Sequence, residues 1–321
     1  MTWQQRVRGF LFPFDSDAWL TALRIGLGLI VVFYAWSLRV DWRYLFAGTG
    51  RGLVSRQLFE GLLSTESPLI PRLGWFVWIC QRLGLGEGFA LSIGWLLLFL
   101  AGCLLLLGLF SRPAAILAWF LQLAAAKSGG LLSYGADNFV TIGLFYLMIA
   151  PLPDRWAFDA RRQSQQKPDP HLFGFHRRIL QVHLCFIYFF GGLTKCLGAG
   201  WWDGSNMWRA LTTPPFDLVP IRLVASWSAV LPILGISVCL VETSYALLIW
   251  PRWSRRVVLG AVCAMHIAIG LLMGMYLFAL IMLVLNIAAF GVGDQSREEW
   301  EARDEDRATQ IARQSTPEWR A

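Results

Sequence analysis

The amino-acid sequence predicts an all-α fold, a polytopic helical membrane bundle with about eight transmembrane helices and additional interfacial helices. Hydrophobic residues make up 56% of the chain and charged residues only 15%, and the mean hydropathy is +0.51. These values lie well outside the range of ordinary soluble domains. Apolar runs also recur along the chain, and the first of them, Ala18–Val40, is too long for a cleaved signal peptide.

Charge and cysteine content exclude several other classes of protein. The net charge is +7, and no basic block alternates with aromatic residues as nucleic-acid binding would require. We therefore expect membrane lipid, and not nucleic acid, as a partner of the basic loops. The six cysteines form no C-x-x-C pair, and the four histidines lack metal-ligand spacing, so we expect neither a disulfide framework nor a bound metal.

The chain begins with a basic amphipathic stretch, Met1–Asp17, which suits the membrane interface. The first span, Ala18–Val40, carries Arg24 roughly 10 Å inside it, which is too deep to face lipid without a partner. The long connection Asp41–Glu87 contains the aromatic stretch Leu73–Ile79. This stretch is too short to span, so we expect an interfacial helix there.

Three further spans are separated by short turns. The second covers Gly88–Phe110 and the third, with Pro113 in its first turn, covers Ala114–Ala126. The fourth begins at Asp137 and ends at Pro151. Asp137 stands at an N-cap position, where its carboxylate can accept a bond from a free backbone N–H, and a functional role for it stays open.

The second half of the chain begins with a hydrophilic linker, Leu152–His176, which we expect to stay in water. The fifth span is Arg177–Lys195 and the sixth is Leu223–Trp250. The seventh and eighth spans form a hairpin within Arg255–Phe290. The composition then changes abruptly to charged residues, which predicts an exposed tail over residues 294–321.

Positive charge predicts the orientation of the bundle. Lys and Arg are concentrated in the first residues, in the Leu152–His176 linker and in the tail, which favours cytoplasmic N- and C-termini in a cell membrane, plasma or inner. Residues 1–293 then form one transmembrane domain, and residues 294–321 form a cytoplasmic tail.

Depth along the spans groups the polar residues. Arg24 and Glu242 both fall in the inner half, and we expect them to form a structural ion pair. The outer half holds a second group, which consists of Asp137, Asn138, Lys195, Trp201, Trp202, Asp203 and His266. Lys195 has two interpretations: a partly desolvated amine that acts as a base, or an anchor whose stem lies in lipid and whose head lies in water.

Several motifs together resemble the horizontally transferred transmembrane (HTTM) domain, the membrane domain of vitamin K-dependent gamma-glutamyl carboxylases. The similarity extends from about Asp15 to Phe290. The motifs that carry it are Phe189–Lys195 followed by Trp201–Gly204 and Met207–Trp208, Asp137–Asn138, Arg24, Gly108–Arg112, and His266 followed by Gly274–Phe278.

The resemblance implies a carboxylase-like enzyme of lyase or quinol-epoxidising type whose cofactor is a reduced isoprenoid quinone, a vitamin K-type hydroquinone. It implies that Lys195 is the base that deprotonates the hydroquinone, that His266 donates to a reacting oxyanion, and that Asp137 lies beside them. We expect the substrate to be bound by Asn138, Trp201, Trp202 and Asp203.

A second hypothesis comes from a different class. The chain ends at Ala321 without the large extracytoplasmic domain through which the carboxylases engage a protein substrate, and the spacing after Lys195 is about one residue longer than theirs. Carboxylation of a protein glutamate is therefore not expected. The alternative is a non-catalytic membrane protein that binds a lipid or isoprenoid, or that is a partner in the maturation or export of another protein.

Overall fold

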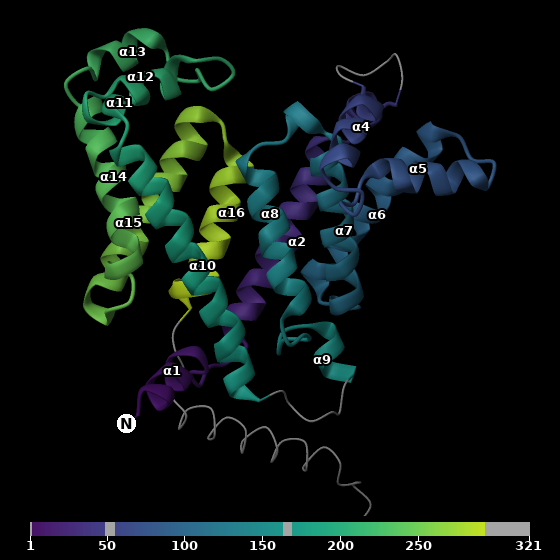
Figure 1. The fold of residues 1–321 in the computed structure, drawn as a ribbon, viewed down its shortest axis with the longest axis horizontal. Coiled ribbons are helices and arrows are strands. Elements are labelled where there is room, and N and C mark those ends of the chain that lie inside the picture. Colours follow the sequence, from purple (N-terminus) through teal and green to yellow (C-terminus); the bar gives the residue numbers. More distant parts are fainter. Residues whose placement is uncertain (1, 49–54, 163–168, 293–321) are drawn as a thin grey trace, which may run out of the picture.

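The structure, a computed structural model, describes residues 2–48, 55–162 and 169–292 (Figure 1). Within these ranges every regular element is a helix, which confirms the all-α prediction. The long helices are α2 (Ala18–Ser37), α6 (Glu87–Leu107), α7 (Ser111–Ser128), α8 (Gly135–Ile149), α10 (Pro170–Cys196), α14 (Leu231–Leu248), α15 (Arg252–Met273) and α16 (Tyr276–Asn286), which a π-helical turn, Ile287–Gly291, extends.

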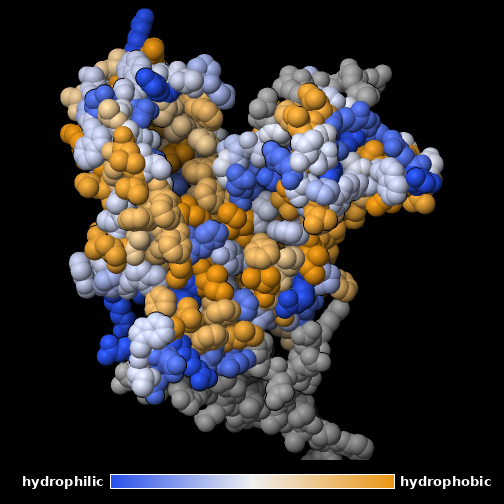
Figure 2. Space-filling model, in the orientation of Figure 1, coloured by the Kyte–Doolittle hydropathy of each residue, from blue (hydrophilic) through white to orange (hydrophobic). Residues whose placement is uncertain are grey.

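Short helices lie at the two ends of this bundle (Figure 1). One end carries α1 (Trp3–Leu11) and α9 (Phe158–Arg162). The opposite end carries α4 (Arg56–Glu66), α5 (Leu73–Arg82), α11 (Ala199–Trp202), α12 (Ser205–Thr212) and α13 (Ile221–Ser226). Figure 2 shows hydrophilic side chains gathered toward both ends and apolar ones over the flanks between them, as expected for a bundle surrounded by lipid.

Among the described residues, five helices are long and apolar enough to cross a membrane, namely α2, α6, α10, α14 and α15, and α8 and Tyr276–Gly291 are shorter apolar helices. The polytopic membrane fold is thereby confirmed, whereas the count of eight spans stays a prediction. The predicted Leu73–Ile79 helix is present as part of α5. The expected charged tail, residues 294–321, lies outside the described residues.

The predicted sixth span, Leu223–Trp250, is wrong as one continuous helix. It is divided into α13 and α14 by a turn at residues 227–230. Pro232 accounts for the new start, because a proline without an N–H is accommodated in the first turn of a helix and not in its interior. As a result α13 lies with α11 and α12 at the end of the bundle.

The core of the bundle is centred on α2, which packs against α6, α8 and α16. Two glycines allow α2 and α6 to approach closely. A Cβ added at Gly28 would lie 2.8 Å from the backbone nitrogen of Leu106, and one at Gly102 would lie 3.0 Å from that of Val32. Small residues at such contacts are the usual means by which membrane helices pack backbone to backbone.

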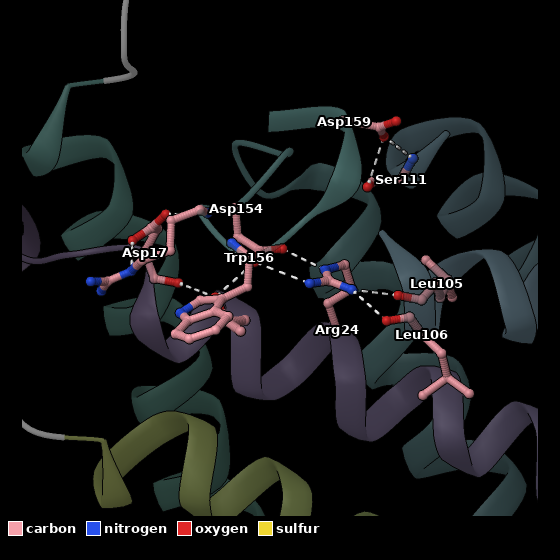
Figure 3. Close-up of polar contacts among 10 residues, drawn as sticks. Asp17, Arg24, Leu105, Leu106, Ser111, Asp154, Trp156 and Asp159 are labelled. Atoms are coloured by element: carbon pink, nitrogen blue, oxygen red, sulfur yellow. Dashed lines mark hydrogen bonds and ion pairs between the residues drawn. The ribbon is translucent and has the colours of Figure 1, made fainter. Parts of the chain in front are cut away.

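Arg24 pairs with Asp154, and not with Glu242 as the sequence had suggested. Its Nε lies 2.5 Å from Asp154 Oδ2, and the two side chains are 1% and 0% exposed. Its Nη1 donates to the carbonyl oxygens of Leu105 and Leu106, at the end of α6 (Figure 3). The prediction failed because it considered only acidic residues within spans, whereas Asp154 follows the fourth span in the linker.

The linker prediction is corrected for the same reason. The part of Leu152–His176 that follows α8 does not stay in water but folds back against α2 and α6, where Asp154 is buried. Asp159 accepts from the backbone N–H of Ser111 at 2.7 Å (Figure 3). It also accepts from the backbone N–H of Phe110 at 3.0 Å and so caps the start of α7. The linker also ends earlier than predicted, because the side chain of Asp169 caps α10 at residue 170.

Candidate functional site

The site begins with an ion pair between α10 and α14, two antiparallel helices that pack closely. Lys195 Nζ lies 2.5 Å from Glu242 Oε2. Gly192 allows this approach, because a Cβ at that position would lie only 2.5 Å from the backbone nitrogen of Thr243. Glu242 therefore has Lys195 as its partner, which is the second half of the correction to the predicted Arg24–Glu242 pair.

The Lys195–Glu242 pair lies well along α14 and not at its start. Glu242 is eleven residues past Leu231, about 16 Å along α14 at 1.5 Å per residue. The first part of α14 is covered by α11 and α12, with Trp201 packed directly against Gly235. The Lys195 and Glu242 side chains are 26% and 10% exposed. A charged pair at this depth in a membrane bundle favours a functional site over an anchor.

The aromatic residues that follow Lys195 divide into two groups. The ring of Trp201 covers the amine, with Nζ 5.5 Å from the ring centroid. Trp202 instead donates from its indole to the carbonyl oxygen of Cys196 and is largely exposed. Asp203 is exposed at the start of α12, where hydrogen bonds from the backbone N–H and side chain of Ser205 lower its pKa. Asp203 thus has a capping role in this structure.

A second polar layer lies farther along the same two helices and includes His266. His266 is 3% exposed, and its Nε2 is 2.7 Å from the hydroxyl oxygen of Tyr188. Asn286 Nδ2 donates to that same hydroxyl oxygen at 2.7 Å, and Tyr245 donates its own hydroxyl proton to Asn286 Oδ1 at 2.8 Å. All four side chains are buried, and they come from four helices, α10, α14, α15 and α16.

The two layers share one face of each helix. Tyr188 and Lys195 are seven residues apart on α10, so they point the same way about 10 Å apart along the axis. Glu242 and Tyr245 are three residues apart on α14 and also lie on one side. The ring centroids of Tyr188 and Tyr245 are 4.2 Å apart. The interface therefore carries a charged layer and a neutral hydrogen-bonded layer next to each other.

The hydrogen bonds around His266 favour one of its two neutral tautomers. The Tyr188 hydroxyl accepts from Asn286, so its single proton is available for His266 Nε2, the other partner within reach. Donation of that proton makes Nε2 the acceptor and leaves the proton of a neutral imidazole on Nδ1, whereas the other tautomer would leave the buried Tyr188 proton without an acceptor. Nδ1 is buried and has no hydrogen-bond partner. Such a donor normally finds an acceptor, because leaving it unpaired costs about 1–3 kcal/mol.

Asp137 and Asn138 do not join these layers. Asp137 accepts from the backbone N–H of Tyr134 at 3.0 Å, so it caps α8 from inside the first turn and not from the predicted N-cap position. It lines a separate cavity of about 130 Å³ with Tyr34, between α2, α7, α8 and α16. Asn138 is exposed. Of the predicted site residues, the structure thus brings together Lys195, Trp201 and Glu242, with His266 in the next layer.

Sequence reasoning missed Tyr188, Tyr245 and Asn286. Asn286 could have been found, because it is the only amide in the apolar run Tyr276–Phe290, and polar residues inside membrane helices rarely lack a role. The two tyrosines gave no such signal, since tyrosine is common near membrane interfaces. In the described ranges, no group of three His, Cys, Asp or Glu side chains is placed to hold a metal ion.

Comparison with known proteins gives one match. A family model, the HTTM domain, matches residues 78–291, about two-thirds of the chain. The matched region includes both layers of the site and leaves out α2. No curated protein and no solved structure matches the chain significantly.

Proposed function

The chain belongs to the HTTM domain family, and on this premise we propose that this integral membrane protein is a quinol-coupled enzyme in which Lys195 and Glu242 move a proton at a bound hydroquinone. One observation carries the proposal. A Lys–Glu pair lies within a helical bundle, one layer from a buried histidine whose Nδ1 has no hydrogen-bond partner.

The residues present fit a hydroquinone. The unpartnered Nδ1 of His266 would be satisfied by a ligand oxygen, and the rings of Tyr188 and Phe278 that contact His266 are suited to an aromatic ligand. An isoprenoid tail would find apolar surface on the lipid-facing sides of the helices. When bound, the hydroquinone would supply reducing electrons and, once deprotonated, reactivity toward oxygen.

The lysine and its partner can accept a proton as a unit. Transfer of the ammonium proton from Lys195 to Glu242 leaves a neutral amine and a neutral carboxylic acid, and a low-dielectric site lowers the cost of that neutral pair relative to the ion pair. The neutral amine is then a base. Trp201 covers the ammonium form through its ring face and limits the access of water.

His266 has a different part. Tyr188 holds Nε2 and so fixes the orientation of the ring, from which Nδ1–H would donate to an oxygen of a bound ligand. A fixed donor of this kind stabilises negative charge that develops on oxygen. The buried Tyr188–Asn286–Tyr245 chain keeps the tautomer from changing, because each of its protons is already committed.

A substitution at Lys195 tests the proposal. Lys195→Arg keeps the positive charge and the stem but cannot release a proton near neutral pH, so the activity should fall by about 10²-fold or more. The assay is hydroquinone-dependent oxygen uptake by the purified full-length protein in lipid nanodiscs, supplied with chemically reduced menaquinone. Lys127→Arg, at an exposed lysine at the end of α7, is the matched control.

Two outcomes would overturn the proposal. Absence of uptake by the wild-type protein would contradict enzymatic turnover of a hydroquinone. Full activity of Lys195→Arg at equal abundance would show that arginine suffices and would leave the non-catalytic lipid- or partner-binding alternative.

We further propose that the termini are cytoplasmic in a cell membrane, with α11–α13 on the outer face. The basic residues near α1 and α9 support this orientation. In a cysteine-free background, Ser226→Cys in α13 should react with an impermeant maleimide in intact cells, and Arg161→Cys in α9 should not. Both positions are exposed, so the reverse labelling pattern would refute the orientation.

A further inference from the structure

Two cysteines that the mechanism does not use lie on the two helices that carry the ion pair. Cys196 is the last residue of α10, directly after Lys195, and Cys239 lies on α14 one turn before Glu242 and Thr243. Cys196 Sγ lies 3.5 Å from Thr243 Oγ1, and Thr243 is one helical turn from Cys239 on α14. Both are free thiols.

Helix register places the two thiols opposite each other. In antiparallel helices, moving forward by one turn on one helix corresponds to moving back by one turn on the other. Gly192 contacts Thr243, so the position four residues after Gly192 meets the position four residues before Thr243. These positions are Cys196 and Cys239. Because the backbones nearly touch at Gly192, the helices are close there, as a disulfide between them requires.

We propose that Cys196 and Cys239 form a redox-active dithiol that reduces a quinone at this site and becomes a disulfide. The inference rests on the proposed function in one respect, the presence of an isoprenoid quinone. It goes further by naming the reductant from which the hydroquinone is made.

The reaction balances as a two-electron exchange. Each thiol loses its S–H proton, the two sulfur atoms lose two electrons and form one S–S bond, and the quinone takes up both electrons and both protons to become the hydroquinone. Lys195 and Glu242 flank both thiols on the same helices, so the pair can receive a thiol proton and return it. A dithiol reductant then restores the thiols by attack at Cys196, which is partly exposed, whereas Cys239 is fully buried.

The experiment measures thiols directly. The full-length protein in nanodiscs is reduced, freed of reductant without oxygen, and treated with decyl-ubiquinone, whose fully substituted ring cannot add thiols. Remaining thiols are then alkylated and counted by mass spectrometry. We expect two of the six cysteines to become protected, a linked Cys196–Cys239 peptide, and an equal amount of quinone consumed. Cys239→Ser should lose all three signals, and Cys103→Ser on α6, the matched control, should lose none.

Three results would overturn the inference: quinone reduction that persists in Cys239→Ser, a disulfide formed with diamide but not with decyl-ubiquinone, or no disulfide with either oxidant. The oxygen-uptake assay keeps these failures distinct from failure of the proposed function, because it supplies hydroquinone ready-made. If the Cys196→Ser variant retains hydroquinone-dependent oxygen uptake, the proposed function stands, whether or not the two cysteines are redox-active.

Discussion

The Arg24–Asp154 pair allows a quantitative test of the fold. The change is to replace each residue alone, as Arg24→Met and Asp154→Leu, and then both together. In Asp154→Leu, the Arg24 guanidinium still donates to the carbonyl oxygens of Leu105 and Leu106, but it has no counter-charge. The Arg24 side chain is only 1% exposed, so water cannot replace that counter-charge. Stranding one charge of a buried pair costs about 3–5 kcal/mol.

The two single replacements should differ. With Arg24 removed, the Asp154 carboxylate still accepts from Thr21 Oγ1 at 2.7 Å and from the backbone N–H of Trp156 at 3.1 Å. Asp154→Leu also takes the acceptor from these two donors, whereas the Leu105 carbonyl oxygen still accepts from the Gly108 N–H after Arg24→Met. A buried group left without a partner costs about 1–3 kcal/mol, so Arg24→Met should fall at the lower end of the range and Asp154→Leu at the upper end. The double replacement leaves no stranded charge and should cost less than either single one.

The assay is the free energy of unfolding, measured by SDS titration of the purified protein in detergent micelles. A coupling energy of at least about 2 kcal/mol between Arg24 and Asp154 is expected. Arg24→Met combined with Glu242→Gln serves as the control cycle and should be additive within about 0.5 kcal/mol, since the two residues have different partners. Additive losses for Arg24 and Asp154 would refute the burial argument.

Two further substitutions test the packing and the hydrogen bonds of the site. Gly192→Ala should force α10 away from α14, destabilise the protein by about 1–3 kcal/mol and abolish activity. The control, Gly191→Ala, meets only ordinary contacts and should be tolerated. Thermal midpoints and oxygen uptake measure both variants, and equal effects would contradict the close approach of the two helices. Tyr188→Phe leaves His266 Nε2 and one Asn286 N–H without a partner and should lower the free energy of SDS unfolding by about 1–3 kcal/mol. The control, Tyr276→Phe, changes a side chain that is 61% exposed and should have little effect. No loss of stability in Tyr188→Phe would disprove the hydrogen-bonded layer.

Much of the fold could be predicted because lipid imposes strict rules on helix length and composition. The runs that became α2, α6 and α10 stand out by hydropathy, and the motifs around Lys195 resemble the HTTM domain, whose family model indeed matches the chain. Lys195 and His266 attracted attention for one physical reason, since polar groups are costly among apolar helices.

The choice of partners could not be predicted in the same way. The depth argument assumed that every helix begins level with the membrane surface. The start of α14 is instead covered by α11 and α12, and Glu242 lies opposite Lys195 at the end of α10. Asp154 was assigned to a linker, because nothing in its local sequence shows that the chain folds back to Arg24. The hydrogen-bonded layer around His266 joins four helices, and such convergence is a property of packing that periodicity does not contain.

The position of α2 determines whether the segment matched by the family model can fold on its own. The match begins at residue 78, inside α5, and so omits the helix around which α6, α8 and α16 are arranged. A fragment that started at residue 78 would expose the core residues that pack against α2, and it would leave the Asp154 carboxylate without its counter-ion. We therefore expect the matched residues alone not to be an autonomous folding unit. In this chain the matched segment therefore depends on α2, which lies outside it, to complete the core of the bundle.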